Sequence, residues 1–164
     1  MKILIFVQDV GLGGVLRQTS LLADGLGRKG HEVSVLGLAE RDRNWRYVWN
    51  SGVELSVLYT KPSSGAPGRA ARLIRTALAL RSRVKKEKVD VLYALQGDVV
   101  KFISWLATRG TEVRLVWGRR GSGNRTGPYY SHWKRSVVFR LCDWASGSVP
   151  LAIANSEAGA RQER

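Results

Sequence analysis

The feature of this sequence that most constrains its fold is a regular alternation of short apolar runs with amphipathic segments. Residues 2–7 are apolar and partly β-branched, and glycines follow them, as in a buried strand. Residues 15–28 carry apolar side chains at helical spacing, and Lys29 and Gly30 supply the cation and glycine of a helix C-terminus. Polar and apolar side chains alternate over residues 31–36, which predicts a second strand. This order predicts a parallel sheet with a right-handed crossover.

The same alternation continues along the whole chain. It predicts further strands at residues 52–58, 89–94, 113–117 and 151–154, further helices at 69–87, 99–108 and 130–146, and a helix that opens at Asn155. Six strands alternating with helices predict a doubly wound, mainly parallel, Rossmann-like α/β sheet with helices on both faces. A length of 164 residues suits one such domain, over residues 1–164.

The helix predicted over residues 69–87 is strongly amphipathic. Its apolar face should pack on the core and comprises Ala70, Leu73, Ile74, Ala77, Leu78 and Val84. The basic residues that lie mostly opposite are Arg69, Arg72, Arg75, Arg83 and Lys86. We interpret this basic face as a contact for an anionic membrane surface, and the alternative is a solvated helix face.

Amino-acid composition limits the binding partners of this chain and the kinds of metal or disulfide site that it can form. The chain has 27 Lys and Arg against 13 Asp and Glu, a net charge of +14. Such a charge favours nucleic acid, an anionic membrane or phosphorylated substrates, or serves solubility alone. One cysteine, Cys142, excludes a disulfide framework, and two histidines are too few for a histidine-built metal site. No apolar run is long enough to span a bilayer and no signal peptide is recognisable, so we expect a cytoplasmic protein. We also expect neither a metal nor a cofactor.

A glycine-rich loop between the first strand and helix is the first candidate site. Gly11 and Gly13 fit two positions of the dinucleotide fingerprint, but Leu16 occupies the third, and the phosphate-loop motif of nucleotide triphosphatases is absent. Glycines at a helix N-terminus still let an anion or a sugar approach the backbone. Gly13, Gly14 and Arg17 are therefore candidate substrate contacts, unless the glycines serve only close packing.

Two further candidates follow later strands. Arg119 and Arg120 begin a Gly/Arg/Ser loop after the fifth strand, where the ligand crevice of an open α/β sheet lies. They form either a phosphate clamp or a solvated basic loop. Gln96 and Asp98 follow the fourth strand and are candidates to face the same crevice. For Asp98 we favour the alternative of a helix N-cap. No nucleophile elbow, carboxylate pair or other complete catalytic set is visible.

Five segments in order resemble the N-terminal half of family-4 glycosyltransferases. Residues 1–7, Gly13-Gly14 with Arg17-Gln18, and the run ending Gly30-His31-Glu32-Val33 resemble the opening of that family. There, a strand precedes a Gly-Gly-Ala-Glu-Arg loop and a Gly-His-Glu-Val run. Residues 89–93 match its Pro-Asp-Val-Val-His segment, and residues 153–158 match its Ile-Ala-Asn-Ser-Glu-Ala segment. Departures from the pattern are Leu16 in place of the loop glutamate, and Tyr93 or Leu95 in place of a histidine.

The resemblance implies one half of a GT-B architecture, in which two Rossmann-like domains face a cleft. The N-terminal domain of such enzymes mostly holds the acceptor, and the C-terminal domain holds the nucleotide-sugar and is expected to be absent from this chain. Gly13 and Gly14 would reach the donor diphosphate. Arg17, Gln96, Arg119 and Arg120 would contact the acceptor or a phosphate.

The expected activity is sugar transfer from a nucleoside diphosphate-sugar to a lipid-linked or cell-envelope glycan. The resemblance implies retained anomeric configuration and no metal, and the chain alone is expected to be inactive. Basic residues suggest a peripheral position on the inner face of the membrane. One alternative is a non-enzymatic module that binds phosphate or a nucleotide. A nucleic-acid binder fits less well, because the aromatic residues lie within periodic helices and strands as core residues do.

Overall fold

The computed structural model describes residues 1–10, 14–40, 52–59, 69–95, 97–119, 144 and 151–154. Its elements in chain order are β1 (Lys2–Val10), α1 (Gly14–Arg28), β2 (Glu32–Glu40), β3 (Glu54–Tyr59), α2 (Arg69–Lys86), β4 (Val91–Leu95), α3 (Asp98–Thr108), β5 (Arg114–Arg119) and β6 (Leu151–Ala154). All of them lie where the sequence pattern predicts a strand or a helix. The helices predicted over residues 130–146 and from Asn155 fall outside the described residues, apart from Trp144.

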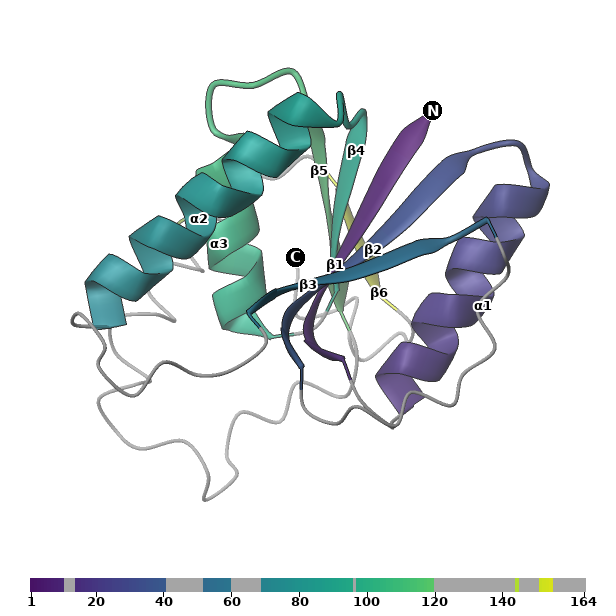
Figure 1. Ribbon diagram of the computed structural model, residues 1–164, viewed down its shortest axis with the longest axis horizontal. Coiled ribbons are helices and arrows are strands. Elements are labelled where there is room, and N and C mark those ends of the chain that lie inside the picture. Colours follow the sequence, from purple (N-terminus) through teal and green to yellow (C-terminus); the bar gives the residue numbers. More distant parts are fainter. Residues whose placement is uncertain are drawn as a thin grey trace.

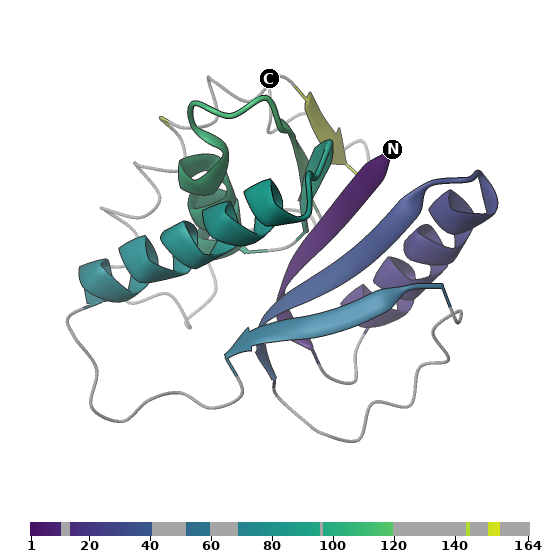
Figure 2. The ribbon, with the colours of Figure 1, turned by 45° about the horizontal axis from the view of Figure 1, so that its top comes forward.

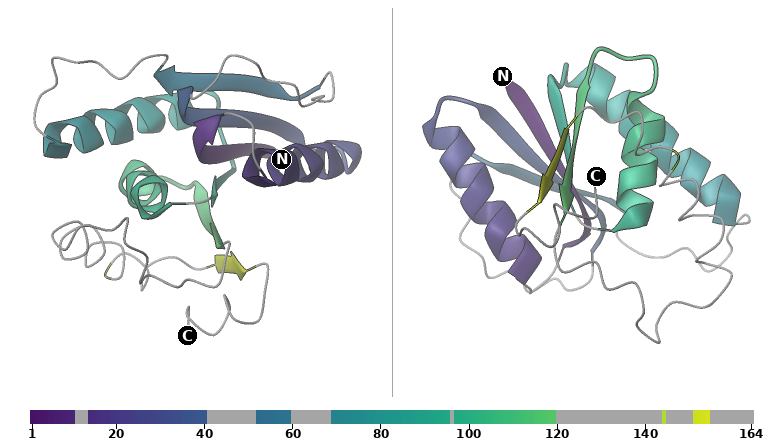
Figure 3. Two further views of the ribbon diagram at one scale, coloured as in Figure 1. Left: turned by 90° about the horizontal axis from the view of Figure 1, so that it is seen from below. Right: turned by 180° about the vertical axis from the view of Figure 1, so that it is seen from behind.

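The six strands form one sheet in the order β3-β2-β1-β4-β5-β6, and every neighbouring pair is parallel. α1 covers one face of the sheet, and α2 and α3 cover the other (Figures 1 and 3). Figure 2 shows α2 and α3 side by side, in agreement with their mutual packing. The predicted doubly wound, Rossmann-like α/β class is therefore confirmed.

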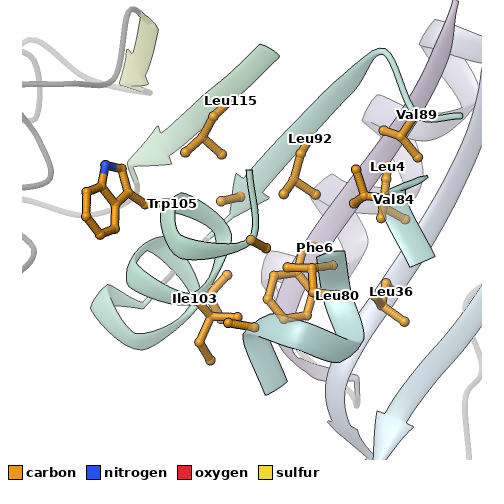
Figure 4. Close-up of a cluster of buried hydrophobic side chains, with 14 of the residues drawn as sticks. Leu4, Phe6, Leu36, Leu80, Val84, Val89, Leu92, Ile103, Trp105 and Leu115 are labelled. Atoms are coloured by element: carbon orange, nitrogen blue, oxygen red, sulfur yellow. The ribbon is translucent and has the colours of Figure 1, made fainter. Parts of the chain in front are cut away.

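Strand alternation divides the core into two layers. Successive side chains of a strand point to opposite faces, so Ile5 and Val7 of β1 pack with Leu16 of α1, while Leu4 and Phe6 pack under α2 and α3. Figure 4 shows the second layer, whose labelled residues are Leu4, Phe6, Leu36, Leu80, Val84, Val89, Leu92, Ile103, Trp105 and Leu115. Apolar burial on both faces explains why β1 is a nearly continuous apolar run.

The buried face of α2 differs from the prediction. Thr76, Ala77, Leu80 and Val84 are buried, whereas Ile74 is 53% exposed and Leu78 60% exposed. The expectation that Ile74 and Leu78 join the core is thus wrong. Thr76 can be buried because its hydroxyl donates to the Arg72 carbonyl over 2.8 Å and lies 3.1 Å from the Tyr59 hydroxyl.

The end of α2 sets where β4 begins. Lys88 takes a left-handed conformation (φ 53°), and the Val89 N–H donates to the Val84 carbonyl at 3.0 Å, which together close the helix. The Asp90 N–H then donates to Lys2 O at 2.9 Å, which brings β4 into register beside β1.

The described part of the chain contains neither a membrane-spanning helix nor a cluster of metal-binding side chains. There, no helix is long and apolar enough to cross a membrane. In the same residues, no group of three or more histidine, cysteine or acidic side chains is placed to hold a metal ion.

Candidate functional site

The topology places a switch point at the carboxyl ends of β1 and β4. These two strands are neighbours, but the chain leaves β1 for α1 on one face and leaves β4 for α3 on the other. Ligands of open α/β sheets bind at such a switch point. In Figure 1 the amino end of β1 is at the top, and both α1 and α3 begin at the lower edge of the sheet.

The first segment at this switch point is the connection from β1 to α1. β1 ends with exposed Gln8 and Asp9 and buried Val10, and α1 begins at Gly14. Among the described residues, a Cβ atom on Gly14 would meet no other atom within 4 Å, so that part of the structure leaves the backbone open to a ligand. Arg17 lies in the first turn and is exposed, and that turn has no acidic residue. Free N–H groups and an arginine together favour an anion.

The second segment at this switch point is the connection from β4 to α3. Gly97 is the N-cap residue of α3, with φ 82° and ψ 130°, and no side chain caps the helix. The prediction of Asp98 as N-cap is therefore wrong by one residue, because Asp98 is already the first helical residue. A Cβ atom on Gly97 would lie 3.5 Å from Gln8 Cδ and still nearer to Gln8 Oε1. The Gln8 carboxamide thus rests on the backbone at the start of α3.

The third segment at the carboxyl edge of the sheet is the end of β5. A Cβ atom on Gly118 would lie 2.6 Å from the Tyr93 hydroxyl oxygen, so the Tyr93 ring covers this strand end. On the other face, Trp117 is 2% exposed, and Lys101 Nζ lies 5.1 Å from the centre of its ring. Lys101 itself is only 7% exposed, although it belongs to the first turns of α3. A cation-π contact of this kind stabilises a partly desolvated ammonium group.

The structure brings the described members of the predicted site to the same edge. Gly14 and Arg17 begin α1, and Arg119 ends β5, two strands away in the sheet. Gly13, Gln96 and Arg120 lie outside the described residues, as does the side chain of Arg119. Their role as substrate contacts stays a prediction.

Two side chains at this edge were missed by sequence reasoning. Gln8 follows the apolar run of β1, and Lys101 is the only charged residue between positions 99 and 107. A polar residue that interrupts an apolar run at a strand end was the available signal. What the edge offers chemically is binding by N–H groups, cations and a carboxamide.

The predicted basic face of α2 is placed elsewhere, on the outside of the α2/α3 layer. Arg72, Arg75 and Lys86 are exposed, and the side chain of Arg69 is not described. The side chain of Arg83 is only 19% exposed and lies 3.2 Å from Glu54 Oε1 and 2.7 Å from Glu87 Oε1. Arg83 therefore anchors α2 to β3 and does not belong to the free basic face.

A comparison with protein families decides the assignment. The family model described as a glycosyl transferase 4-like domain matches residues 13–164. The chain belongs to this glycosyltransferase family. No curated protein sequence matches it. The resemblance to the N-terminal domain of retaining family-4 enzymes is thus borne out at the level of the family.

Solved structures agree with this family in fold. Sucrose-phosphate synthase from Thermosynechococcus elongatus matches 98% of this chain with a TM-score of 0.70 at 13% identity, over 44% of its own length. MurG from Acinetobacter baumannii matches 94% with a TM-score of 0.60 at 14% identity, over 41% of its length. HepE from Anabaena, solved in complex with UDP, matches 99% with a TM-score of 0.58 at 18% identity, over 40% of its length. Likenesses at such identities show a shared Rossmann-like fold, as in GT-B enzymes, and the chain spans less than half the length of these proteins.

Proposed function

We propose that this chain is the acceptor-binding half of a glycosyltransferase that moves a sugar from a nucleoside diphosphate-sugar to a lipid-linked or cell-envelope glycan. The observation that carries the proposal is a family match over residues 13–164, on a sheet whose switch point lies between β1 and β4. Transfer would retain the anomeric configuration and need neither a metal ion nor a cofactor. The donor-binding half would be a second Rossmann-like domain facing this edge.

The residues of the carboxyl edge divide into two roles in this proposal. Gly13 and Gly14 allow the donor diphosphate to approach the N-terminus of α1. Arg17, Gln96, Arg119 and Arg120 contact the acceptor or one of the phosphates. The support is the open space at Gly14, the exposure of Arg17, and the position of Arg119 at the same edge. Charge-assisted hydrogen bonds from arginine to phosphate are the strongest contacts available to such a site.

Titration of the ¹⁵N-labelled chain with UDP tests this assignment by NMR. We expect saturable shifts of the backbone signals of Gly14, Arg17 and Arg119. Arg17→Ala should weaken binding about tenfold or more, since a hydrogen bond to a charged group contributes about 1.5–3 kcal/mol. Gly14→Val should block binding by filling the open space over the backbone.

Arg28→Ala is the matched control for Arg17→Ala. Arg28 lies at the other end of α1, where its side chain is 76% exposed and pairs with Asp24 at 2.7 Å. Its loss should leave UDP binding unchanged. If UDP shifts no signal at the carboxyl edge, or if Arg28→Ala weakens binding as much as Arg17→Ala does, the site is wrongly assigned.

The exposed face of α2 supports a peripheral membrane position. Ile74 and Leu78 are four residues apart and therefore adjacent on the helix, and Arg75 is three residues from Leu78. Lys86 lies further along the same helix. All four side chains are exposed. A helix that presents apolar side chains next to lysine and arginine can lie in the plane of an anionic bilayer. We include Arg69, Arg72, Arg75 and Lys86 in this surface and leave out Arg83, because it pairs with Glu54 and Glu87.

A further inference from the structure

Gln8 occupies the switch point itself. In β1, Leu4 and Phe6 face α2 and α3, and two residues further on the same side of the strand comes Gln8. Leu4 and Phe6 are fully buried, whereas Gln8 is exposed. The apolar layer between the sheet and α3 thus ends at a carboxamide, which lies beside Gly97 at the carboxyl edge of the sheet.

The Gln8 side chain lies against Gly97. In the conformation that Gln8 takes here, a Cβ atom on Gly97 would lie 3.5 Å from Gln8 Cδ and nearer still to Oε1. Gly97 also has φ +82°, a conformation that other residues rarely adopt. The backbone conformation therefore favours glycine at position 97, and the absence of a side chain there leaves room for the carboxamide. Gln8 lies against the start of α3 and remains exposed.

The chemistry of Gln8 differs from that of the rest of the edge. Arg17 can only donate hydrogen bonds and carries a charge, and Lys101 has the same limits. A carboxamide donates and accepts, and it is neutral. Arginine suits a phosphate, whereas a carboxamide suits a hydroxyl group, which also donates and accepts. A sugar acceptor carries its identity in the positions of its hydroxyl groups.

We propose that Gln8 is a specificity-determining residue that binds one hydroxyl group of the sugar acceptor through its carboxamide. The Nε2 group donates one hydrogen bond to the hydroxyl oxygen, or Oε1 accepts one from the hydroxyl. Gly97 leaves the space in which this carboxamide is held. This inference rests on the proposed function. It adds that Gln8 distinguishes one sugar acceptor from another.

NMR titration of the full chain with methyl glycosides tests the proposal. The probes are the methyl glycosides of glucose, galactose, mannose and N-acetylglucosamine, with UDP in a separate arm. The side-chain amide signals of Gln8 are assigned by their loss in Gln8→Leu. We expect at least one glycoside to shift these signals saturably, and Gln8→Leu to weaken that glycoside about 3- to 10-fold, as the loss of one neutral hydrogen bond does.

Deoxy analogues of the bound glycoside identify the hydroxyl. Removing the hydroxyl that Gln8 binds should weaken binding to the wild-type chain and have no further effect on Gln8→Leu, since both changes delete one interaction. Gln18→Leu is the matched control, because Gln18 is an exposed glutamine on α1, and it should keep wild-type affinity. Gly97→Ala, with folding checked by thermal melting, should weaken the glycoside as Gln8→Leu does.

Different failures identify different errors. If glycosides shift other signals at the carboxyl edge but Gln8→Leu keeps wild-type affinity, the role of Gln8 is refuted and the proposed function stands. If UDP binds at Gly14 and no glycoside shifts the Gln8 amide, the inference is equally refuted while the donor contact stands. If neither UDP nor any glycoside perturbs this edge, the proposed function fails together with the inference.

Discussion

Single residues at the carboxyl edge are constrained by space as much as by chemistry. Gly118 is the clearest case, because a Cβ atom there would lie 2.6 Å from the Tyr93 hydroxyl oxygen and 2.5 Å from Leu95 Cδ1. Both neighbours belong to β4, the strand paired with β5. The glycine therefore lets the two side chains close the α1 face of the sheet above the end of β5.

We expect Gly118→Ala to lower the free energy of unfolding by about 1–3 kcal/mol, the usual cost of an extra methyl group in a packed site. Urea denaturation followed by circular dichroism measures this change. Gly25→Ala is the control, because Gly25 lies in α1 with no atom within 4 Å of a built Cβ. That substitution should stabilise the chain by about 0.5–1 kcal/mol. Equal midpoints for the two variants would contradict the packing argument.

At the scale of elements, α2 holds the end of α3 through Arg81. Its Nη1 donates to the Ala107 carbonyl at 3.3 Å and also to the Arg109 carbonyl. The last carbonyls of a helix have no partners within the helix. A guanidinium from the neighbouring helix satisfies two acceptors at this end of the molecule, and Arg109 stacks on Trp105 at 4.7 Å nearby.

Replacing Arg81 should therefore be costly for a residue at the surface. We expect Arg81→Ala to destabilise the chain by about 1–3 kcal/mol, since hydrogen bonds from a charged donor contribute about that much. Hydrogen exchange should accelerate in the last turn of α3 before it does in α1. Arg72→Ala, on the exposed side of the same helix, is the control and should stay within about 0.5 kcal/mol of wild type. A similar loss in both variants would show that helix propensity, rather than the cap, is responsible.

The outer face of α2 makes a separate prediction. The chain should bind phosphatidylglycerol-containing vesicles but not phosphatidylcholine vesicles, and binding should weaken as salt rises through about 0.15 M, where the screening length is about 8 Å. Arg72→Glu with Arg75→Glu should abolish binding, and Ile74→Ser with Leu78→Ser should weaken it. Sedimentation with vesicles measures each effect.

The control for this surface lies on α1. Arg28→Glu with Lys29→Glu changes the net charge equally at two exposed residues far from α2 in sequence, and it should reduce binding much less. Equal binding to neutral vesicles would overturn the electrostatic part of the proposal. No loss in the serine variants would overturn the apolar part.

On the scale of the whole molecule, the proposal requires a second surface for the donor. We expect the 164-residue chain to transfer no sugar when it is incubated alone with nucleotide-sugars and envelope lipid extracts. Radiolabelled donors followed by chromatography of the lipid fraction measure transfer. Product formed by this chain alone would refute the division of donor and acceptor between two domains.

The sequence predicted the class and order of elements because their periodicity reflects burial, which the sheet imposes on every strand. It failed where burial depends on neighbours distant in sequence. Ile74 and Leu78 are apolar yet exposed, because α3 packs against a different side of α2. Arg83 does not belong to the free basic face of α2, because it forms an ion pair with Glu54 of β3. At the site, the contact between Gln8 and Gly97 joins residues from two strand ends, which no local pattern contains.

The central position of β1 has a consequence for synthesis of the chain. β1 is made first, and it pairs with β2 on one side and with β4 on the other, where Ile3 lies opposite Val91. Between the completion of β2 at Glu40 and of β4 at Leu95, translation takes roughly 3 to 11 seconds at about 5–20 residues per second. During that interval one edge of β1 has no native partner. Leu4 and Phe6 also lack native cover until α2 is complete at Lys86, and that cover is finished only when α3 ends at Thr108. An open strand edge beside an uncovered apolar face is a target for chaperones and for aggregation, so the nascent chain is most vulnerable before its fourth strand emerges from the ribosome.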